Sequence, residues 1–276
     1  GMPWDGVSYK ISGINHMAWL LEISRNGEDL YPIIRKRAQE GPIYAPTLAL
    51  RELHPEYADR IPSVAEQFTP DNHHDMVRFE IMKQFGYFVT ESSEHSSEYY
   101  PWFIKRDHPE LIDRFHIPLD EYPRRCRDQI ARWKQQAEHL VHNENLTHTR
   151  SSEYAAGIIE ALETGRTFGF AGNVLNTGLI DNLPFDACVE VSCMVNEGHL
   201  SPCHMGPLPN QLAALNRRQI EVHQLTVDAA LTRKKEYIYQ AAMLDPHAGS
   251  ELTIDEIRSL VDDLIQAHGD WLPEYH

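Results

Sequence analysis

The sequence has few cysteines and no long apolar run, and these shortages exclude several classes of protein. Four cysteines in 276 residues are too few for a disulfide-stapled scaffold, so reduced thiols are expected. No apolar stretch approaches the roughly 18–20 residues that a membrane-spanning helix needs. No basic and apolar leader precedes the first apolar run, which favours a cytoplasmic location.

Basic residues are also scarce. The chain has 25 lysines and arginines against 41 acidic residues, which gives a formal net charge of -16. A surface with this balance repels phosphate backbones and anionic lipid headgroups, so neither nucleic acid nor a membrane is an expected partner.

Glycine-rich phosphate-binding motifs are missing as well. Neither G-x-G-x-x-G nor G-x-x-x-x-G-K-[ST] occurs, so we expect that this chain contains no Rossmann-type dinucleotide-binding domain. The G-x-S-x-G motif is absent too, and hydrolysis by a serine nucleophile has no support.

Short apolar runs and long helical periods are what the sequence does contain. The length allows one large domain or two small ones, and the pattern predicts a few strands surrounded by long helices. Proline-rich residues 41–71 show no period and are predicted to be irregular. The other predicted elements are a strand over 7–24, a helix over 28–39 with an acidic first turn, a helix from Asp71 or Asn72 to Phe85 with Gly86 after it, a helix over 120–142, a helix over 151–165, short strands over 167–205, one or two helices over 208–244, and a last helix that opens with the capping box Thr253–Glu256 and ends at Gly269.

Two polar residues, Asn15 and His16, interrupt an otherwise apolar run over 11–23. Burying either side chain without a hydrogen-bond partner would cost roughly 1–3 kcal/mol, so each needs a protein partner, a ligand or a metal ion. Taken alone, the pattern favours the simplest case, in which a backbone carbonyl accepts a hydrogen bond from the imidazole.

A second polar cluster, from Thr90 to His95, directly follows an apolar run that ends at Val89. A solvated loop is the simpler interpretation. In the functional interpretation, the Glu91 and Glu94 carboxylates face a sugar or a metal ion, where they accept hydrogen bonds from hydroxyls or transfer a proton.

Two further segments allow a structural or a functional interpretation. Asparagine and glycine recur over 172–184, which suits tight turns, although amides such as that of Asn182 also suit sugar hydroxyls. Soft sulfur and imidazole ligands for zinc occur further on, but their spacing matches no strong ligand pattern. These residues are Cys193, His199, Cys203 and His204.

Seven segments, spread in order along nearly the whole chain, carry a joint resemblance. They are Ser12–Trp19, Gly86–His95, Ile117–Pro123, Gly178–Pro184, Cys188–Val191, Gln211–Asn216 and Ala242–His247. Together they resemble glycoside hydrolase family 4, and most closely its α-galactosidases.

The resemblance implies an enzyme of two parts, and this chain is similar to the second part only. In that family an amino-terminal domain holds NAD. A carboxy-terminal domain completes the sugar site. For this chain the resemblance implies a single domain over residues 1–276 of the α+β class, with a small, mostly antiparallel sheet and long helices, like the carboxy-terminal domain of lactate-dehydrogenase-type enzymes. The implied cofactors are NAD and Mn²⁺ or another divalent metal ion, and the implied reaction is an exception to two-carboxylate hydrolysis. NAD takes hydride from the sugar C3, a base removes the C2 proton, and the metal ion stabilises the enolate.

The resemblance also implies roles for individual residues. His16 maps onto the family's metal-binding histidine and Asn15 onto an adjacent substrate-contacting asparagine, while the family's cysteine ligand lies upstream. The catalytic base varies between branches, so three residues stay candidates for catalytic groups, namely Glu91, Glu94 and His95.

Three more residues are candidates for substrate contacts, namely Ser92, Arg78 and Asn182. Branches that act on 6-phosphosugars need basic phosphate contacts. Arg78 is the one such candidate near the polar clusters, so an unphosphorylated galactoside is the favoured substrate.

Three hypotheses follow. The chain is the carboxy-terminal part of a family 4 α-galactosidase, with a separate NAD-binding domain as partner and little activity alone. Alternatively, it is a non-catalytic remnant that binds sugar or oligomerises, or it is an independent zinc protein built on Cys193, Cys203 and His204. A homo-oligomer is expected, since the family tends to form dimers or tetramers.

Overall fold

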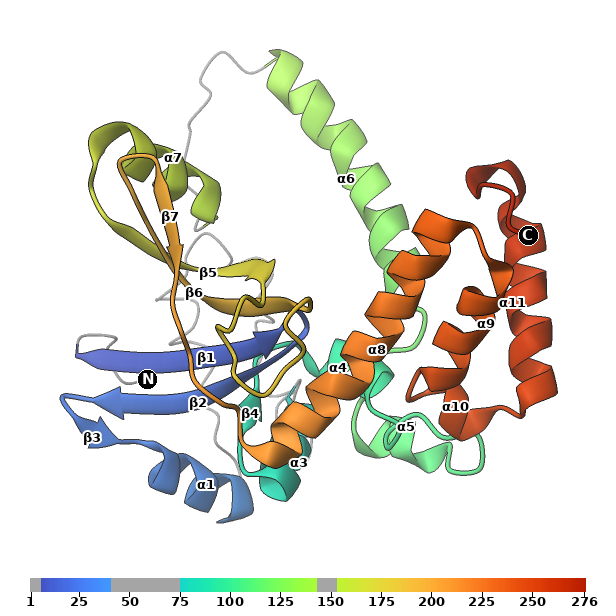
Figure 1. The fold of residues 1–276 in the computed structure, drawn as a ribbon, viewed down its shortest axis with the longest axis horizontal. Helices are drawn as coiled ribbons and strands as arrows, with labels where there is room; N and C mark the ends of the chain where they lie inside the picture. Colours follow the sequence, from blue (N-terminus) through green and yellow to red (C-terminus); the bar gives the residue numbers. More distant parts are fainter. Residues whose placement is uncertain (1–5, 41–74, 143–152) are drawn as a thin grey trace.

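The computed structural model describes residues 6–40, 75–142 and 153–276, which form one antiparallel sheet and a larger set of helices (Figure 1). The sheet order is β3-β2-β1-β6-β5, with β4 also paired to β2 and β7 also paired to β6. The predicted α+β class is therefore confirmed. The strands are β1 (Val7–Ile14), β2 (Met17–Arg25), β3 (Glu28–Asp29), β4 (Phe88–Val89), β5 (Phe168–Leu175), β6 (Cys188–Asn196) and β7 (His199–Pro202).

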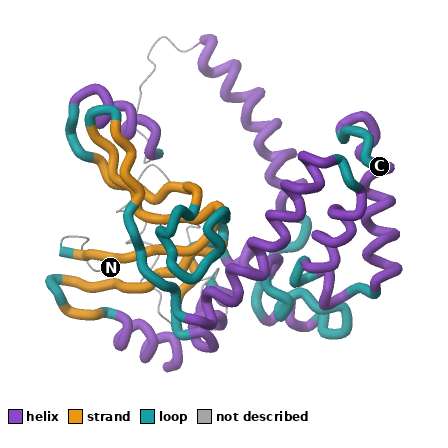
Figure 2. Tube along the Cα trace, viewed as in Figure 1, coloured by secondary structure: helices purple, strands orange, loops and turns teal. Residues whose placement is uncertain are grey.

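The strands gather on one side of the molecule and the C-terminal helices on the other (Figure 2). The long helix α8 runs from the sheet into this helical part, where it packs against α9, and α9 packs against α11. The helices are α1 (Tyr31–Glu40), α3 (Met76–Phe85), α4 (Ser93–Tyr99), α5 (Glu110–Arg114), α6 (Glu121–His142), α7 (Tyr154–Thr164), α8 (Asn210–Thr232), α9 (Lys235–Leu244), α10 (Ala248–Glu251) and α11 (Ile254–His268), followed by a 3₁₀ turn over Gly269–Trp271.

The core lies where β2, α3, β6 and α8 meet. Trp19, Val77, Val189 and Leu212 come from these four elements, and each is fully buried. Burial of a side chain of this size contributes roughly 1.5–3 kcal/mol.

A polar side chain of α8 also lies within this core. Asn216 of α8 is fully buried. Its Oδ1 accepts a hydrogen bond of 3.0 Å from Trp19 Nε1, and its Nδ2 donates one of 2.8 Å to the Met17 carbonyl oxygen. This pair of bonds, the Asn216 brace, fastens α8 to the start of β2, directly after Asn15 and His16.

The prediction of a single strand over 7–24 is wrong, because the chain reverses at Asn15 and His16. Ile14 pairs with Met17, so these two polar residues form the connection of a β1–β2 hairpin. His16 has a left-handed backbone, with φ of 65°. The residues on both sides of the turn are apolar because the ends of both strands are buried. In the sequence, the two strands therefore look like one apolar run.

The first predicted helix also begins later than expected. Residues 28–29 form β3 instead of an acidic first turn, and the Asp29 carboxylate accepts a hydrogen bond of 2.9 Å from Tyr31 N at the start of α1. Helix α3 ends as predicted before Gly86, whose φ is 84°. The predicted irregular segment over 41–71, the caps at Asp71 or Asn72, and the predicted start at Ser151 lie outside the described residues.

Several later predictions are confirmed. Helices α8 and α9 are the two pieces expected over 208–244, and the Thr253–Glu256 capping box opens α11. Helix α6 forms as predicted, but its apolar stripe covers no core. None of its residues is buried, and Ile130 and Trp133 are 60% and 61% exposed. Among the described helices, none combines the length and the apolar content needed to traverse a bilayer.

Candidate functional site

A polar cluster forms where the β1–β2 turn meets the segment between β4 and α4. Strand β4 pairs with β2 through Trp19 and Val89. Just beyond, Thr90 N donates a hydrogen bond of 2.9 Å to the Ala18 carbonyl oxygen. Because β2 begins at the turn and β4 runs antiparallel to it, the residues after Val89 arrive beside His16.

His16 contacts three side chains of this cluster, which are those of Glu91, His95 and Tyr99. Its Nδ1 lies 3.1 Å from the Tyr99 hydroxyl oxygen, and its Nε2 lies 3.6 Å from Glu91 Oε2. The His16 and His95 ring centroids are 5.0 Å apart. The His16 side chain is 36% exposed, so the ring is open to solvent. Its hydrogen-bond partner is the Tyr99 phenol and not the backbone carbonyl that the sequence pattern favoured.

The turn exposes Asn15 and gives His16 a left-handed backbone conformation. Asn15 is exposed at the tip, where its amide is accessible to a ligand. His16 adopts the left-handed conformation, which costs a residue with a Cβ of the order of 1–3 kcal/mol and is enriched at functional sites. The conformation therefore makes this histidine a candidate for a functional role.

The start of α4 fixes the other half of the cluster. Ser92 is the N-cap, and its Oγ accepts a hydrogen bond of 3.3 Å from His95 N. Glu91 Oε1 accepts a bond of 2.8 Å from Ser92 N. The Ser92 hydroxyl thus has a structural partner, and the Glu91 carboxylate has one oxygen fixed by the backbone and the other directed at His16.

Nearby charges and burial shift the pKa of two groups here. Burial, with help from the Glu98, Glu91 and Asp245 carboxylates, raises the pKa of Tyr99, so its phenol keeps its proton at neutral pH. Burial and the Glu91 charge raise the pKa of Glu190, which lies opposite Gly13 of the turn strand in the β1–β6 pairing.

Sequence reasoning missed both Tyr99 and Glu190. Tyr99 follows His95 by one helical turn, so the i, i+4 spacing was a signal for it once α4 was known. Glu190 stands alone between Val189 and Val191, which are both buried in β6. A single acid in an apolar strand was a weaker signal of the same kind as His16.

Arg78 and Glu94, both predicted site residues, have protein partners. The Arg78 guanidinium donates to Asp75 Oδ1 at 2.9 Å and to the carbonyl oxygens of Val89 and Thr90, each at 3.2 Å. It therefore supports the backbone that leads into Glu91. Glu94 Oε2 accepts a bond of 2.7 Å from Arg125 of α6.

Asn182 and the cysteine and histidine residues lie in other parts of the fold. The Asn182 side chain bonds both the N–H and the carbonyl oxygen of Leu208, at 3.0 and 2.8 Å. Cys193 is buried, which raises the pKa of its thiol, and His204 Nε2 lies 2.7 Å from Asp181 Oδ1. Nowhere in the described ranges do three or more His, Cys, Asp or Glu side chains converge as a metal site, so the independent zinc hypothesis has no structural support.

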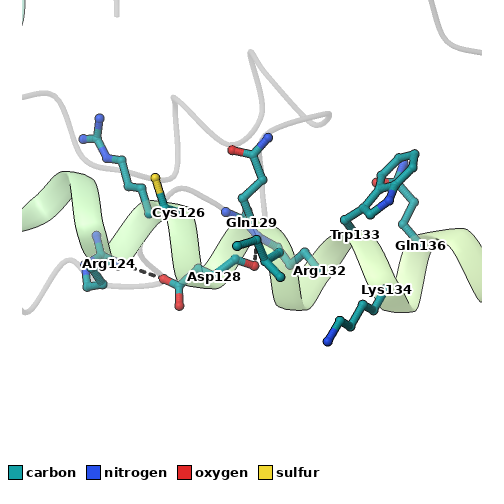
Figure 3. A pocket seen from close by; sticks show the side chains of 10 residues that line it. Arg124, Cys126, Asp128, Gln129, Arg132, Trp133, Lys134 and Gln136 are labelled. Carbon is teal, nitrogen blue, oxygen red and sulfur yellow. Dashed lines mark hydrogen bonds and ion pairs between the residues drawn. The ribbon is translucent and has the colours of Figure 1, made fainter. Parts of the chain in front are cut away.

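A wide hollow of about 1210 Å³ lies elsewhere, against α6. In the described part of the chain, all of its lining residues come from that single helix, and their side chains are already paired in part, as between Arg124 and Asp128 (Figure 3). A site with convergent groups needs more than one element to supply them. The cluster at His16 brings together four side chains from two segments, namely His16, Glu91, His95 and Tyr99, and we consider it the better candidate.

The cluster can hold a divalent cation only in part. His16 Nε2 and Glu91 Oε2 are two donors of suitable chemistry, since imidazole and carboxylate both bind such ions. The Nδ1 contact with Tyr99 is the kind of secondary bond that orients metal-binding histidines. His16 and Glu91 could therefore supply two ligands of a divalent cation, and the other ligands would have to come from elsewhere.

Comparison with known proteins assigns the class. Residues 11–248 match the family 4 glycosyl hydrolase C-terminal domain, and the chain belongs to this family. Over 275 residues it is 54% identical to an α-galactosidase from Bacillus subtilis (strain 168), a match that covers 100% of the chain and 57% of that protein.

Solved structures have the same fold. The chain superposes with a TM-score of 0.72 and 17% identity on a 6-phospho-α-glucosidase from gut microorganisms in complex with NAD and glucose-6-phosphate, covering 99% of this chain and 58% of that one. A second 6-phospho-α-glucosidase structure from gut microorganisms, with NAD and Mn²⁺, gives a TM-score of 0.64 at 20% identity and covers 100% and 58%. The chain spans a little more than half the length of the relatives it matches.

Proposed function

We propose that this chain, as one domain over residues 1–276, forms the carboxy-terminal part of an α-galactosidase that uses NAD and Mn²⁺ or another divalent cation. The observation that carries the proposal is the cluster of His16, Glu91 and Tyr99, which lies within the family match. A separate NAD-binding domain and a homo-oligomer belong to the same proposal.

His16 is the residue that we expect to bind the cation. Its Nδ1 is engaged by the Tyr99 hydroxyl, so Nε2 is the nitrogen left to act as a ligand. In the complete enzyme NAD would take hydride from the sugar C3. The cation would stabilise the negative charge that develops beside C3 when the C2 proton is removed. Asn15, exposed beside His16, is placed to bond a sugar hydroxyl.

The charges around the cluster favour an uncharged sugar. Glu91 and Glu190 are close enough to interact, and burial together with the Glu91 charge raises the pKa of Glu190. Arg78 donates to three protein oxygens, so it holds the Glu91 segment instead of offering its charge to a phosphate. These contacts support an unphosphorylated galactoside over a 6-phosphosugar as substrate.

Glu91 and His95 stay candidates for moving a proton at the sugar. Glu91 has one carboxylate oxygen open toward His16. His95 Nδ1 is buried and has no hydrogen-bond partner among the described residues. The Glu94 carboxylate is compensated by Arg125, which makes it the weaker candidate for a catalytic base.

The test is a hybrid enzyme. The part of the Bacillus subtilis α-galactosidase that lies outside the match is joined to the amino end of this chain, and p-nitrophenyl α-galactoside is assayed with NAD, Mn²⁺ and a thiol. We expect turnover by the hybrid, little by the chain alone, and a loss of orders of magnitude in the His16→Ala hybrid. Equal turnover with and without the added part would refute the division of the site.

The preferred substrate is tested by comparing the rates of the hybrid on three glycosides. The hybrid should hydrolyse the α-galactoside faster than the corresponding 6-phospho-α-glucoside or α-galacturonide. Preference for either anionic substrate would contradict the charge argument. A folded hybrid that binds galactose but hydrolyses none of the three would favour the non-catalytic remnant.

A further inference from the structure

His16 and Glu91 each have two polar side-chain atoms, and in each residue one of the two contacts a protein partner. His16 Nδ1 meets the Tyr99 hydroxyl at 3.1 Å, and Glu91 Oε1 accepts from Ser92 N at 2.8 Å. The remaining atoms, His16 Nε2 and Glu91 Oε2, face each other at 3.6 Å. This separation is too long for a hydrogen bond between them.

The same separation suits a shared cation. Two metal–ligand bonds of about 2.1–2.3 Å that meet at ~100° place their donor atoms about 3.2–3.5 Å apart. A shift of a few tenths of an ångström would bring His16 Nε2 and Glu91 Oε2 into that range. Divalent cations such as Mg²⁺ commonly bind one or two protein donors and complete their coordination with water or substrate.

We propose that Glu91 binds the divalent cation directly, together with His16, and that Tyr99 positions the His16 ring for it. The inference rests on the proposed function, which assigns only His16 to the metal ion. It gives Glu91 the role of a ligand instead of a proton carrier, and it makes Tyr99 a positioning residue that acts through His16.

The test is a Mn²⁺ titration of the 276-residue chain, followed by NMR. Bound Mn²⁺ broadens the amide signals of nearby residues even at partial occupancy, so weak binding is still measured. The signals of Asn15, Ala18 and Ser92 should broaden first, and Mg²⁺ serves as the diamagnetic control. The variants are His16→Ala, Glu91→Gln and Tyr99→Phe, with Glu98→Gln as the matched control.

Glu98 is a suitable control because it lies on α4 next to Tyr99, is exposed, and loses the same charge on substitution. We expect Glu91→Gln to weaken Mn²⁺ binding at least tenfold and Tyr99→Phe by roughly 10–100-fold. Glu98→Gln should stay within twofold of the unsubstituted chain. Thermal unfolding of Tyr99→Phe, unchanged to within a few degrees, separates positioning from a general loss of structure.

The outcomes separate the inference from the proposed function. Loss of binding in His16→Ala with unchanged binding in Glu91→Gln would overturn the inference and leave the assignment of His16 intact. Unchanged broadening in His16→Ala would refute the metal assignment in the proposed function itself. Broadening centred away from the turn, or none at all, would reject the cation pair.

Discussion

The Asn216 brace gives the strongest prediction for stability. In Asn216→Ala, the buried Trp19 Nε1 loses its acceptor at 3.0 Å and the Met17 carbonyl oxygen loses its donor at 2.8 Å. A buried polar group left without a partner costs about 1–3 kcal/mol, so the two together should cost about 2–6 kcal/mol. Since domains are stable by only about 5–15 kcal/mol, this is a large fraction of the total.

The measurement is urea unfolding followed by far-ultraviolet circular dichroism. Gln224→Ala is the matched control, because Gln224 lies on the same helix and bonds Asp186 Oδ1 at 2.9 Å in an exposed position. We expect the control to change the free energy of unfolding by less than about 0.5 kcal/mol. A loss in Asn216→Ala no larger than in the control would refute the argument from burial.

A double-mutant cycle refines the same prediction. Trp19→Phe removes the indole donor, so part of the cost of Asn216→Ala is already incurred. The double variant should therefore be more stable than the sum of the single losses implies, by about 0.5–3 kcal/mol. Simple additivity would mean that the two side chains do not interact in solution.

Two further predictions concern the turn and the ion pairs. A Cβ on Gly13 would lie 2.6 Å from the Met17 carbonyl oxygen and 2.7 Å from Ala18 Cα. A Cβ on Gly27, whose φ is 85°, would meet no described atom within 4 Å, so Gly27→Ala adds backbone strain without a clash. Gly13→Ala should therefore lower the midpoint of thermal unfolding more than Gly27→Ala, and equal shifts would show that the hairpin yields. The hydrogen bond from the Lys105 ammonium lowers the pKa of Glu251 from 4.5 to about 2, so its stabilisation is present above about pH 4.5 and is lost as the pH falls toward 2. The stability gap between the unsubstituted chain and Glu251→Gln should close over this window, and a gap that does not depend on pH would contradict the pairing.

The helices were the most predictable part of the fold. Gly86 and the Thr253–Glu256 pair act through local backbone geometry, so their effect does not depend on the rest of the chain. The β1–β2 turn was missed because its apolar flanks reflect burial by distant elements. The alternation expected of a half-exposed hairpin is therefore absent over 11–23.

Sequence reasoning named part of the candidate cluster, namely His16, Glu91 and His95, but it missed Tyr99. His16 and Glu91 stood out as polar groups beside apolar runs, and the structure brings them together. Arg78, Ser92 and Asn182 have the same residue types as ligand-binding groups, but their partners are backbone atoms whose positions depend on tertiary structure. A sequence alone gives no register between β2 and β4, and that register decides which polar residues meet.

Helix α6 has a consequence for the cluster. With no buried residue, it can unfold locally without opening the core, and its amide hydrogens should exchange at a free energy well below that of global unfolding. Local unfolding removes Arg125 from Glu94, whose side chain is only 11% exposed on α4. Because this coupling is reciprocal, a ligand that stabilises α4 should also protect α6, by at most the free energy that the ion pair contributes. Slower amide exchange in α6 would then indicate that a ligand has bound near Glu94 on α4.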